Sequence, residues 1–375
     1  MKIAVDRNMP LGSEAFSTLG EVAIIDGRRL QSSDIMDTSI LAIRSTTKVN
    51  AALLQGTAVE FVGTATIGTD HMDIIYLEEQ GITWMYSPGC NARSVAEYIT
   101  AALLQLAVTH NQPLQGQTLG IIGVGNVGSK VARQAEALGM QVLLCDPPRA
   151  RAEGPDAFCD CHTLLAQSDF VTMHVPLERG GPDPTFHMAN ANFFARMKRG
   201  AFFLNAARGA IADTQALLEA IDASRIKATV LDTWEGEPDI SRDLLNRVAI
   251  GTPHIAGHSF EGKVNGTLMV YEAACRFLQC PPAFDANQHM PHPILPETPM
   301  PASGNAIRDL HLLVKQVYDI MADDARLRET VADKAGFDTL RRQYPIRREF
   351  ACTKVTGIST VPIAQQVAAL GFNIP

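Results

Sequence analysis

The chain has 375 residues, of which 46% are hydrophobic, and it carries a formal net charge of −8. This length predicts two or three domains with cores of their own. The acidic balance gives no general electrostatic support for a nucleic-acid partner. No apolar run approaches the length needed to span a bilayer, so we expect no membrane partner either.

The cysteines and the start of the chain favour a cytoplasmic protein. Seven cysteines, an odd number, are scattered along the sequence, which suits a reducing compartment better than a disulfide framework. Residues 1–5 enter a strand pattern directly, so we expect no cleavable signal. Cys159 and Cys161 form a close pair, but without matching Cys or His pairs they make a poor zinc site, and we expect no metal.

The first 93 residues predict one α/β unit. It contains five short apolar segments, at residues 3–5, 22–25, 41–43, 61–63 and 82–86. Strands that alternate with helix-like segments are typical of a parallel sheet with helical crossovers. Two polar loops, residues 44–48 and 63–70, follow the third and fourth strands, at the edge where open α/β sheets bind ligands. Their hydroxyls, amides and cations would suit an anionic substrate, although ordinary polar loops would look the same.

A helix is predicted over residues 94–110. Ser94 followed by Glu97 has the spacing of a capping box, and apolar residues recur on one face. We expect this helix to carry the chain from one domain to the next.

The segment from Leu119 to Asp146 resembles a dinucleotide-binding fingerprint. A buried strand, residues 119–122, runs into Gly123-x-Gly125-x-x-Gly128; a helix and a second strand follow, and the second strand ends at Asp146. The glycines permit a tight turn, close approach to a pyrophosphate and helix–strand packing. The helix N-terminus would attract phosphate, and Asp146 would bind ribose hydroxyls and repel a 2′-phosphate. The pattern predicts NAD rather than NADP; the alternative is a plain glycine-rich turn.

Four further strands complete a six-stranded doubly wound domain. They are expected at residues 170–175, 201–205, 228–231 and 248–250, and Asp213 is expected to cap a helix through Ile221. Three motifs follow strand ends, where the nicotinamide should lie: residues 205–209, 231–238 and 252–257. Other histidines show no acidic partner in the sequence, so we expect them to be structural; they are His71, His110, His162, His174 and His187.

The C-terminal part changes character. A helix is expected over residues 262–278, and the proline-rich run 291–301 reads as a linker. An amphipathic helix follows Asn305, a strand is expected at residues 350–358, and a short helix at 362–370. We interpret this part as a docking or dimerisation module; the alternative is a regulatory ligand-binding appendage.

Together the three strand-end motifs resemble the signature of the D-isomer-specific 2-hydroxyacid dehydrogenases, over roughly residues 1–280. The resemblance implies Arg208, Glu237 and His254 as the catalytic set. It implies three parts: a discontinuous flavodoxin-like substrate domain (1–93 and 258–280), a Rossmann-like NAD domain (94–257) and a small α+β dimerisation domain (281–375).

Elementary chemistry agrees with these roles. Arg208 has a permanently charged fork that can clamp a carboxylate. His254 can exchange the hydroxyl proton near neutral pH, and Glu237 would fix its tautomer. Taken singly, the three would also be an ordinary salt bridge, a surface acid and a core histidine.

The loops and the tail resemble those of a family member with a phosphorylated 2-hydroxy acid as substrate. The resemblance implies substrate contacts from Arg44, Ser45, Thr66 and His258, the last in place of an expected tyrosine. It implies NAD contacts from the following residues: Gly123, Gly125, Asn126, Val127, Gly128, Asp146, Val175, Ala206, Ala207, Arg208, Asp232 and Gly257. It also implies a homodimer. Arg44 and Lys48 are candidates for the substrate phosphate, and we hypothesise that Arg347 and Arg348 reach a partner's active site.

Two alternatives stay open. A different member of the family, acting on 3-phosphoglycerate or hydroxypyruvate, would share the common domains, although the loops and tail argue against it. An NAD-sensing, corepressor-like binding protein could retain the catalytic residues, although the acidic charge argues against it.

Overall fold

The structure is a computed structural model that describes residues 1–330 and 334–375. The chain forms two compact units, each assembled from two segments. Unit 1 comprises residues 1–91 and 258–292, and unit 2 comprises residues 92–257 and 293–375. In the described part, no helix has both the length and the apolar character needed to cross a membrane.

Unit 1 is a three-layer α/β sandwich around a parallel sheet in the order β2-β1-β3-β4-β5. The strands are β1 (Lys2–Asp6), β2 (Glu21–Ile25), β3 (Thr38–Ile43), β4 (Phe61–Thr64) and β5 (Thr83–Met85). The helices are α1 (Gly12–Phe16), η1 (Ser32–Asp34), α2 (Ala51–Leu54), α3 (Ile74–Glu79), α11 (Phe260–Phe277) and η3 (Ala286–His289). This strand order is that of flavodoxin-like folds, as predicted.

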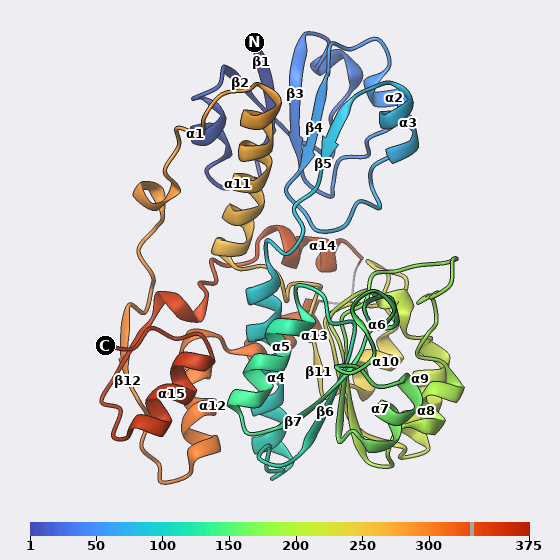
Figure 1. Ribbon diagram of the computed structural model, residues 1–375, viewed down its shortest axis with the longest axis vertical. Coiled ribbons are helices and arrows are strands. Elements are labelled where there is room, and N and C mark those ends of the chain that lie inside the picture. The colour runs from blue at the N-terminus through green and yellow to red at the C-terminus, as the bar shows by residue number, and fades with distance from the viewer. Residues whose placement is uncertain (331–333) are drawn as a thin grey trace. The chain divides into compact units, whose positions relative to one another are not determined.

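Two cores flank this sheet. On one side α1 and α11 lie against each other (Figure 1) and bury Val270, Tyr271 and Ala274 against β1, β3 and β4. On the other side α2 and α3 cover Leu41 and Val62, and Leu77 of α3 lies in the same core. The central strands β1, β3 and β4 are buried on both faces, whereas the edge strands β2 and β5 are partly exposed. One of the two cores of unit 1 therefore depends on α11, which lies much later in the chain than the strands of the sheet.

Unit 2 contains the second parallel sheet, in the order β11-β10-β9-β8-β6-β7. Its strands are β6 (Thr118–Ile122), β7 (Gln141–Cys145), β8 (Phe170–Met173), β9 (Ala201–Asn205), β10 (Ile226–Leu231) and β11 (Ile250–Gly251). The helices between them are α5 (Gly128–Ala137), α6 (Pro147–Glu153), α7 (Cys161–Gln167), α8 (Ala191–Arg196), η2 (Gly209–Ile211), α9 (Thr214–Asp222) and α10 (Arg242–Arg247). The order reverses between β6 and β8, which is where such folds bind nucleotides. Asp213 caps α9 through the amide of Ala216, as predicted.

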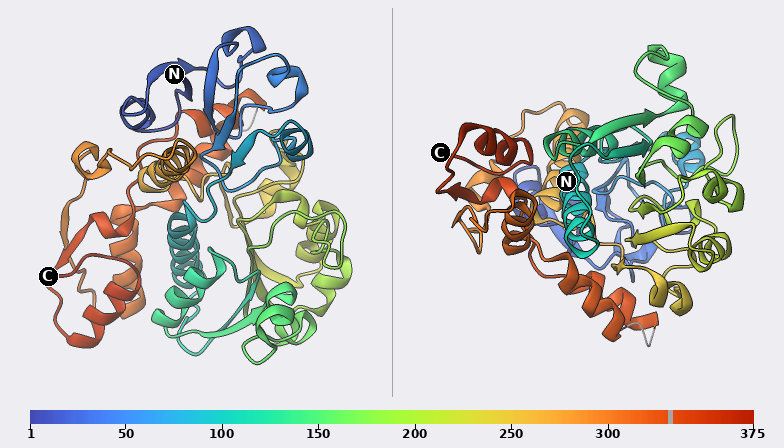
Figure 2. Two further views of the ribbon diagram at one scale, coloured as in Figure 1. Left: turned by 45° about the horizontal axis from the view of Figure 1, so that its top comes forward. Right: turned by 90° about the horizontal axis from the view of Figure 1, so that it is seen from below.

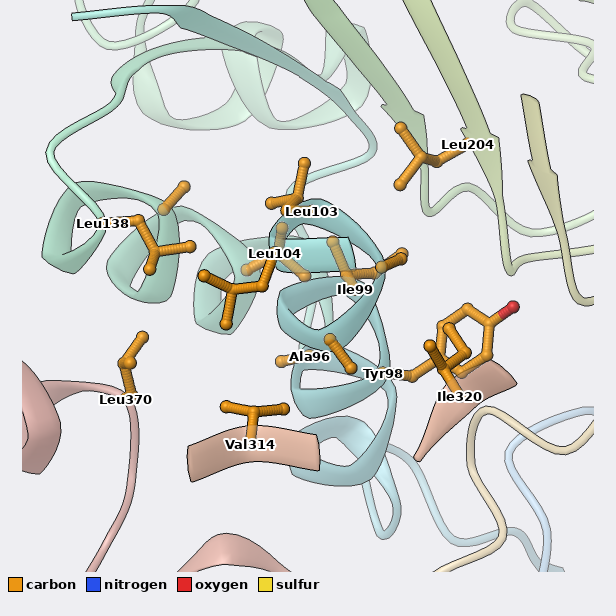
Figure 3. Close-up of a cluster of buried hydrophobic side chains, with 14 of the residues drawn as sticks. Ala96, Tyr98, Ile99, Leu103, Leu104, Leu138, Leu204, Val314, Ile320 and Leu370 are labelled. Atoms are coloured by element: carbon orange, nitrogen blue, oxygen red, sulfur yellow. The ribbon is translucent and has the colours of Figure 1, made fainter. Parts of the chain in front are cut away.

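The helix α4 (Ala92–Thr109) is the centre of the larger core in unit 2. It is apolar nearly all round, as expected of a helix surrounded by protein. Figure 3 shows its Ile99 and Leu104 among Leu138, Leu204, Val314 and Leu370, side chains contributed by the end of α5, by strand β9 and by the C-terminal residues. The C-terminal residues therefore share a hydrophobic core with the nucleotide-binding fold.

The C-terminal residues 293–375 have a small sheet of their own, in which β12 pairs with β13 in parallel. The elements are β12 (Glu297–Pro299), α12 (Ala306–Val317), α13 (Ile320–Thr330), α14 (Lys334–Arg342), η4 (Phe350–Cys352), β13 (Lys354–Thr356) and α15 (Val361–Ala369). α12 lies alongside α4 (Figure 2). Asn305 caps α12 by accepting a hydrogen bond from the amide of Arg308.

Three sequence predictions for these parts were wrong in detail. Ser94 and Glu97 form no capping box, because α4 begins two residues earlier and both side chains are buried inside it. The proline-rich run contains strand β12 rather than being a linker throughout. The strand expected at residues 350–358 is a 3₁₀ turn followed by the shorter β13.

Candidate active site

Glu237 and His254 form a hydrogen-bonded pair. His254 Nδ1 lies 2.7 Å from Glu237 Oε2, and the other carboxylate oxygen accepts a hydrogen bond from the amide of Trp234 at 2.7 Å. Burial raises the pKa of Glu237, but the charge and hydrogen bond of His254 and the Trp234 amide outweigh it, so the pKa is lowered. The side chain of His254 is 32% exposed and that of Glu237 is 19% exposed, so a small molecule can reach the imidazole.

The backbone of His254 is held in an unusual conformation. Its φ is +56°, in the left-handed region that residues other than glycine seldom adopt. Its amide donates to the carbonyl oxygens of Asp232, at 2.7 Å, and Thr252, at 3.0 Å. Conformations of this kind cost about 1–3 kcal/mol and persist where the surroundings enforce them, often at functional sites.

Asp232 supplies much of that enforcement. It is 1% exposed, and its carboxylate accepts hydrogen bonds from the amides of Ile255, at 2.8 Å, and Ala256, at 2.9 Å, and from the Thr252 hydroxyl at 2.6 Å. Burial raises its pKa, although these contacts and the nearby His254 oppose the shift. The structure thus gives Asp232 a role as a support for the loop 252–257.

Arg208 follows β9 in a turn held by Asn205. The amide side chain of Asn205 accepts from the Ala207 amide and donates to the Arg208 carbonyl, both at 3.0 Å. The next residue, Gly209, packs so closely on Trp234 that an added Cβ would lie 2.0 Å from its carbonyl. Glycine therefore lets the turn of Ala206–Arg208 approach the loop that carries Glu237.

The glycine loop has the shape that a pyrophosphate requires. Gly123 has a φ of +89°, and a Cβ there would lie 2.8 Å from Val175 Cγ1; a Cβ on Gly128 would lie 2.1 Å from the Gly123 carbonyl oxygen. Gly125 is exposed, and its Cβ position borders open space. α5 begins at Gly128, and the apolar Val127 at its N-cap offers no hydrogen-bond acceptor to the first amides. These residues fit a dinucleotide.

Asp146 ends β7 beside this loop. Its carboxylate accepts hydrogen bonds from the amide of Val124 at 2.8 Å and from the amide of Arg149 at 3.1 Å, where it caps α6. Arg149 in turn donates to the Val124 carbonyl at 2.5 Å. Besides its expected contact with a ribose, Asp146 therefore fixes the glycine loop, which the sequence did not reveal.

The predicted substrate-binding residues fall in unit 1. Ser45 and Arg44 lie in the turn after β3, where Arg44 Nη1 donates to the Asn8 carbonyl at 3.3 Å. Thr66 follows β4, the neighbouring parallel strand, so these two loops lie at the same sheet edge. His258 immediately precedes Ser259, the N-cap of α11.

Thr66 takes part in a short chain of hydrogen bonds. Its hydroxyl lies 2.8 Å from that of Thr64, which lies 3.0 Å from His71 Nε2. Burial lowers the pKa of His71 to about 4, so this imidazole is neutral near pH 7.

One contact at the edge of the site was missed. The expectation that His187 lacks an acidic partner was wrong: its Nε2 lies 2.5 Å from Glu235 Oε1, and Glu235 also accepts a hydrogen bond from the Thr214 amide. The two residues are 48 positions apart, so no local pattern reports the contact. The available signal was the position of Glu235 in the same motif as Glu237.

Comparison with known proteins agrees with this fold. Residues 94–256 match the family model of the "D-isomer specific 2-hydroxyacid dehydrogenase, NAD binding domain", and residues 290–371 match a "Domain of unknown function (DUF3410)". The NAD-dependent formate dehydrogenase of Staphylococcus aureus, solved in complex with NAD, aligns with a TM-score of 0.60 at 23% identity, over 76% of this chain and 98% of that chain.

The chain belongs to the D-isomer specific 2-hydroxyacid dehydrogenases, which are NAD-dependent oxidoreductases. Within that family it is similar along its whole length to erythronate-4-phosphate dehydrogenases. It is 43% identical to that of Proteus mirabilis, over 100% of this chain and 99% of the relative. It is 45% identical to that of Cellvibrio japonicus, over 100% of both.

Proposed function

We propose that the protein oxidises 4-phospho-D-erythronate to (R)-3-hydroxy-2-oxo-4-phosphooxybutanoate with NAD, a step in the biosynthesis of pyridoxine and pyridoxal 5′-phosphate. Full-length similarity to enzymes of that name supports the substrate. The observation that carries the reaction type is the pairing of His254 with Glu237 beside a nucleotide-binding fold.

The proposed chemistry follows from the pair. Because Nδ1 of His254 donates to Glu237, Nε2 is left with its lone pair and can accept the proton of the C2 hydroxyl. The carboxylate of Glu237 then stabilises the imidazolium. Arg208 would hold the substrate carboxylate by two parallel hydrogen bonds and so set the position of C2. NAD, when bound, supplies the acceptor for the hydride from C2.

For binding, we assign the pyrophosphate to the glycine loop and α5, and the adenosine ribose to Asp146. We assign further NAD contacts to Val175, the turn of Ala206–Arg208, Asp232 and Gly257. Substrate contacts are assigned to Arg44, Ser45, Thr66 and His258. Hydroxyls and a cation in these loops suit a phosphorylated acid.

We also propose that the protein is a cytoplasmic homodimer that associates through residues of the C-terminal region. All seven cysteines are free thiols, which suits a reducing compartment. Light scattering after size-exclusion chromatography tests the stoichiometry; a monomer at micromolar concentration would contradict it.

The decisive experiment measures NADH formation from 4-phospho-D-erythronate and from 3-phosphoglycerate, with the wild type and His254→Ala. We expect kcat/KM to favour 4-phosphoerythronate. Loss of the acid–base group should lower kcat by about 10²–10⁴-fold and leave NADH binding intact. Faster oxidation of 3-phosphoglycerate would contradict the substrate assignment, and NAD binding without any turnover would contradict the activity.

A further inference from the structure

A buried arginine of the C-terminal region contacts the loop that carries His254. Arg347 is 6% exposed, which leaves it little surface to offer a partner's active site; the hypothesis for Arg348 stays a prediction. Its Nη2 donates hydrogen bonds to the carbonyl oxygens of Ser94, at 2.6 Å, and Ala256, at 3.1 Å. The guanidinium carbon lies 4.2 Å from the centre of the Tyr318 ring.

The backbone of Ala256 is therefore hydrogen-bonded through both its amide and its carbonyl. Its amide donates to the buried carboxylate of Asp232, and its carbonyl accepts from Arg347. His254, with its left-handed backbone, lies only two residues earlier. Fixing the peptides just after His254 restricts how far its backbone can relax, and so restricts the direction of its imidazole.

The segment around Arg347 is itself anchored to α4. The Ser94 hydroxyl donates to Glu349 at 3.0 Å, and the amide of Phe350 donates to Glu97 at 3.0 Å. Burial lowers the pKa of Arg347, but Tyr318, Tyr344 and the buried acids Glu97 and Asp323 outweigh it, so the pKa is raised and the guanidinium stays cationic. Removing one member of such a buried polar cluster is destabilising, because it leaves the other members without a partner.

We propose that Arg347 is a positioning residue, through which the C-terminal region holds the loop 252–257 in the conformation that aligns His254 with Glu237. The kinetic part of this proposal rests on the proposed function. It assigns to a region known as a domain of unknown function a direct part in building the active site.

The test compares Arg347→Met and Arg347→Lys with a matched control, Arg328→Met, in the full-length protein. Arg328 is also a C-terminal arginine that donates to two backbone carbonyls of the nucleotide fold, those of Leu245 and Val248. We expect Arg347→Met to lower kcat at least ~10-fold, with kcat normalised to the concentration of NADH-binding sites. We also expect it to change the pH profile of kcat, with a smaller change in KM. Arg347→Lys should lie between it and the wild type, at least ~3-fold below the latter. Arg328→Met should lower Tm and leave kcat unchanged.

Hydrogen–deuterium exchange of peptides covering residues 252–257 gives a readout that does not depend on the substrate. We expect Arg347→Met to accelerate exchange there at least ~10-fold, and Arg328→Met to leave it unchanged. Normal kcat and exchange in Arg347→Met, or equal losses in Arg328→Met, would overturn the proposal. If Arg347→Met does not fold, Arg347→Lys decides, and wild-type kcat and exchange in it would overturn the proposal. A wild type inactive on 4-phosphoerythronate would refute the proposed function, whereas the exchange result would still stand.

Discussion

Asp232 and Glu237, two carboxylates beside the loop 252–257, have pKa values that are shifted in opposite directions. Asp232 is fully buried, with a raised pKa, and holds backbone amides. Glu237 is partly exposed, with a lowered pKa, and holds the imidazole of His254. Neighbouring acids whose pKa values are displaced in opposite directions generally have different tasks. Here one acid fixes the chain and the other is available to the chemistry.

Glu237→Gln should therefore impair catalysis more than folding. Glutamine keeps the size of the side chain but loses the charge that stabilises the imidazolium. We therefore expect kcat to fall at least ~10-fold. The fall should not exceed about 10⁴-fold, the loss seen when an acid that orients a catalytic histidine is replaced by its amide. Steady-state kinetics with saturating NAD measures this. A kcat within twofold of the wild type would show that the pair has no catalytic role.

The lowered pKa of Glu237 predicts that the stability of the fold depends on pH. Because the pKa of Glu237 is lowered from its ordinary value of 4.5, the interaction stabilises the fold above about pH 4.5 and is lost as the pH falls through the lower, folded-state pKa. The Tm difference between the wild type and Glu237→Gln should have its full size above about pH 4.5 and should shrink below that pH. A difference that grows in acid would contradict the assigned shift.

Asp146→Asn should change the choice of cofactor. The amide oxygen can still accept from Val124, but the charge that would repel a 2′-phosphate is gone. We expect the ratio of kcat/KM for NADP to that for NAD to rise at least ~10-fold. Asp146→Ala is the control: it also removes the acceptor, so it should lower Tm and weaken binding of both cofactors.

At the scale of elements, close packing of two turns builds the site. Gly209→Ala would force a Cβ against the backbone of Trp234, so the turn of Arg208 and the loop of Glu237 must move apart. We expect a loss of about 1–3 kcal/mol of stability together with a fall in kcat. Gly180→Ala is the matched control, since its Cβ would meet nothing within 4 Å; wild-type stability and activity in Gly209→Ala would refute the argument.

Elements specified by local pattern were predictable, and those specified by distant contacts were not. The strand–glycine loop–helix around Gly123 and the cap at Asp213 follow from short-range signals. Ser94 looked like a helix cap because Glu97 follows it at the spacing of a capping box. Its actual partner, Glu349, is 255 residues away and leaves no local signal. β12 was hidden among prolines because its pairing strand, β13, begins only at Lys354, beyond the reach of any local pattern. The Glu237–His254 pair was inferred from family motifs, whereas the contact of Arg347 with Ala256 has no local signature.

At the scale of the whole molecule, the C-terminal residues should unfold together with the nucleotide-binding fold. Leu313 of α12 is completely buried in the core around α4, and Leu313→Ala should cost about 2–5 kcal/mol. The chain has two tryptophans, Trp84 in unit 1 and Trp234 in unit 2. In a Trp84→Phe background, the melting of Trp234 fluorescence should shift downward with Leu313→Ala. An unshifted transition would show that the C-terminal region melts independently.

The return of the chain to unit 1 has a consequence for synthesis on the ribosome. The sheet of unit 1 ends at Met85, but α11, which covers one face of it, begins at Phe260, about 175 residues later. At ~5–20 residues per second, this separates the sheet from its cover by about 9–35 s. During that time Ile3, Ile40 and Phe61 lack the apolar side chains that α11 contributes to their core. The nucleotide-binding sheet is translated in the same interval, so the emerging N-terminal segment has to be kept from aggregating until residues 260–277 leave the exit tunnel.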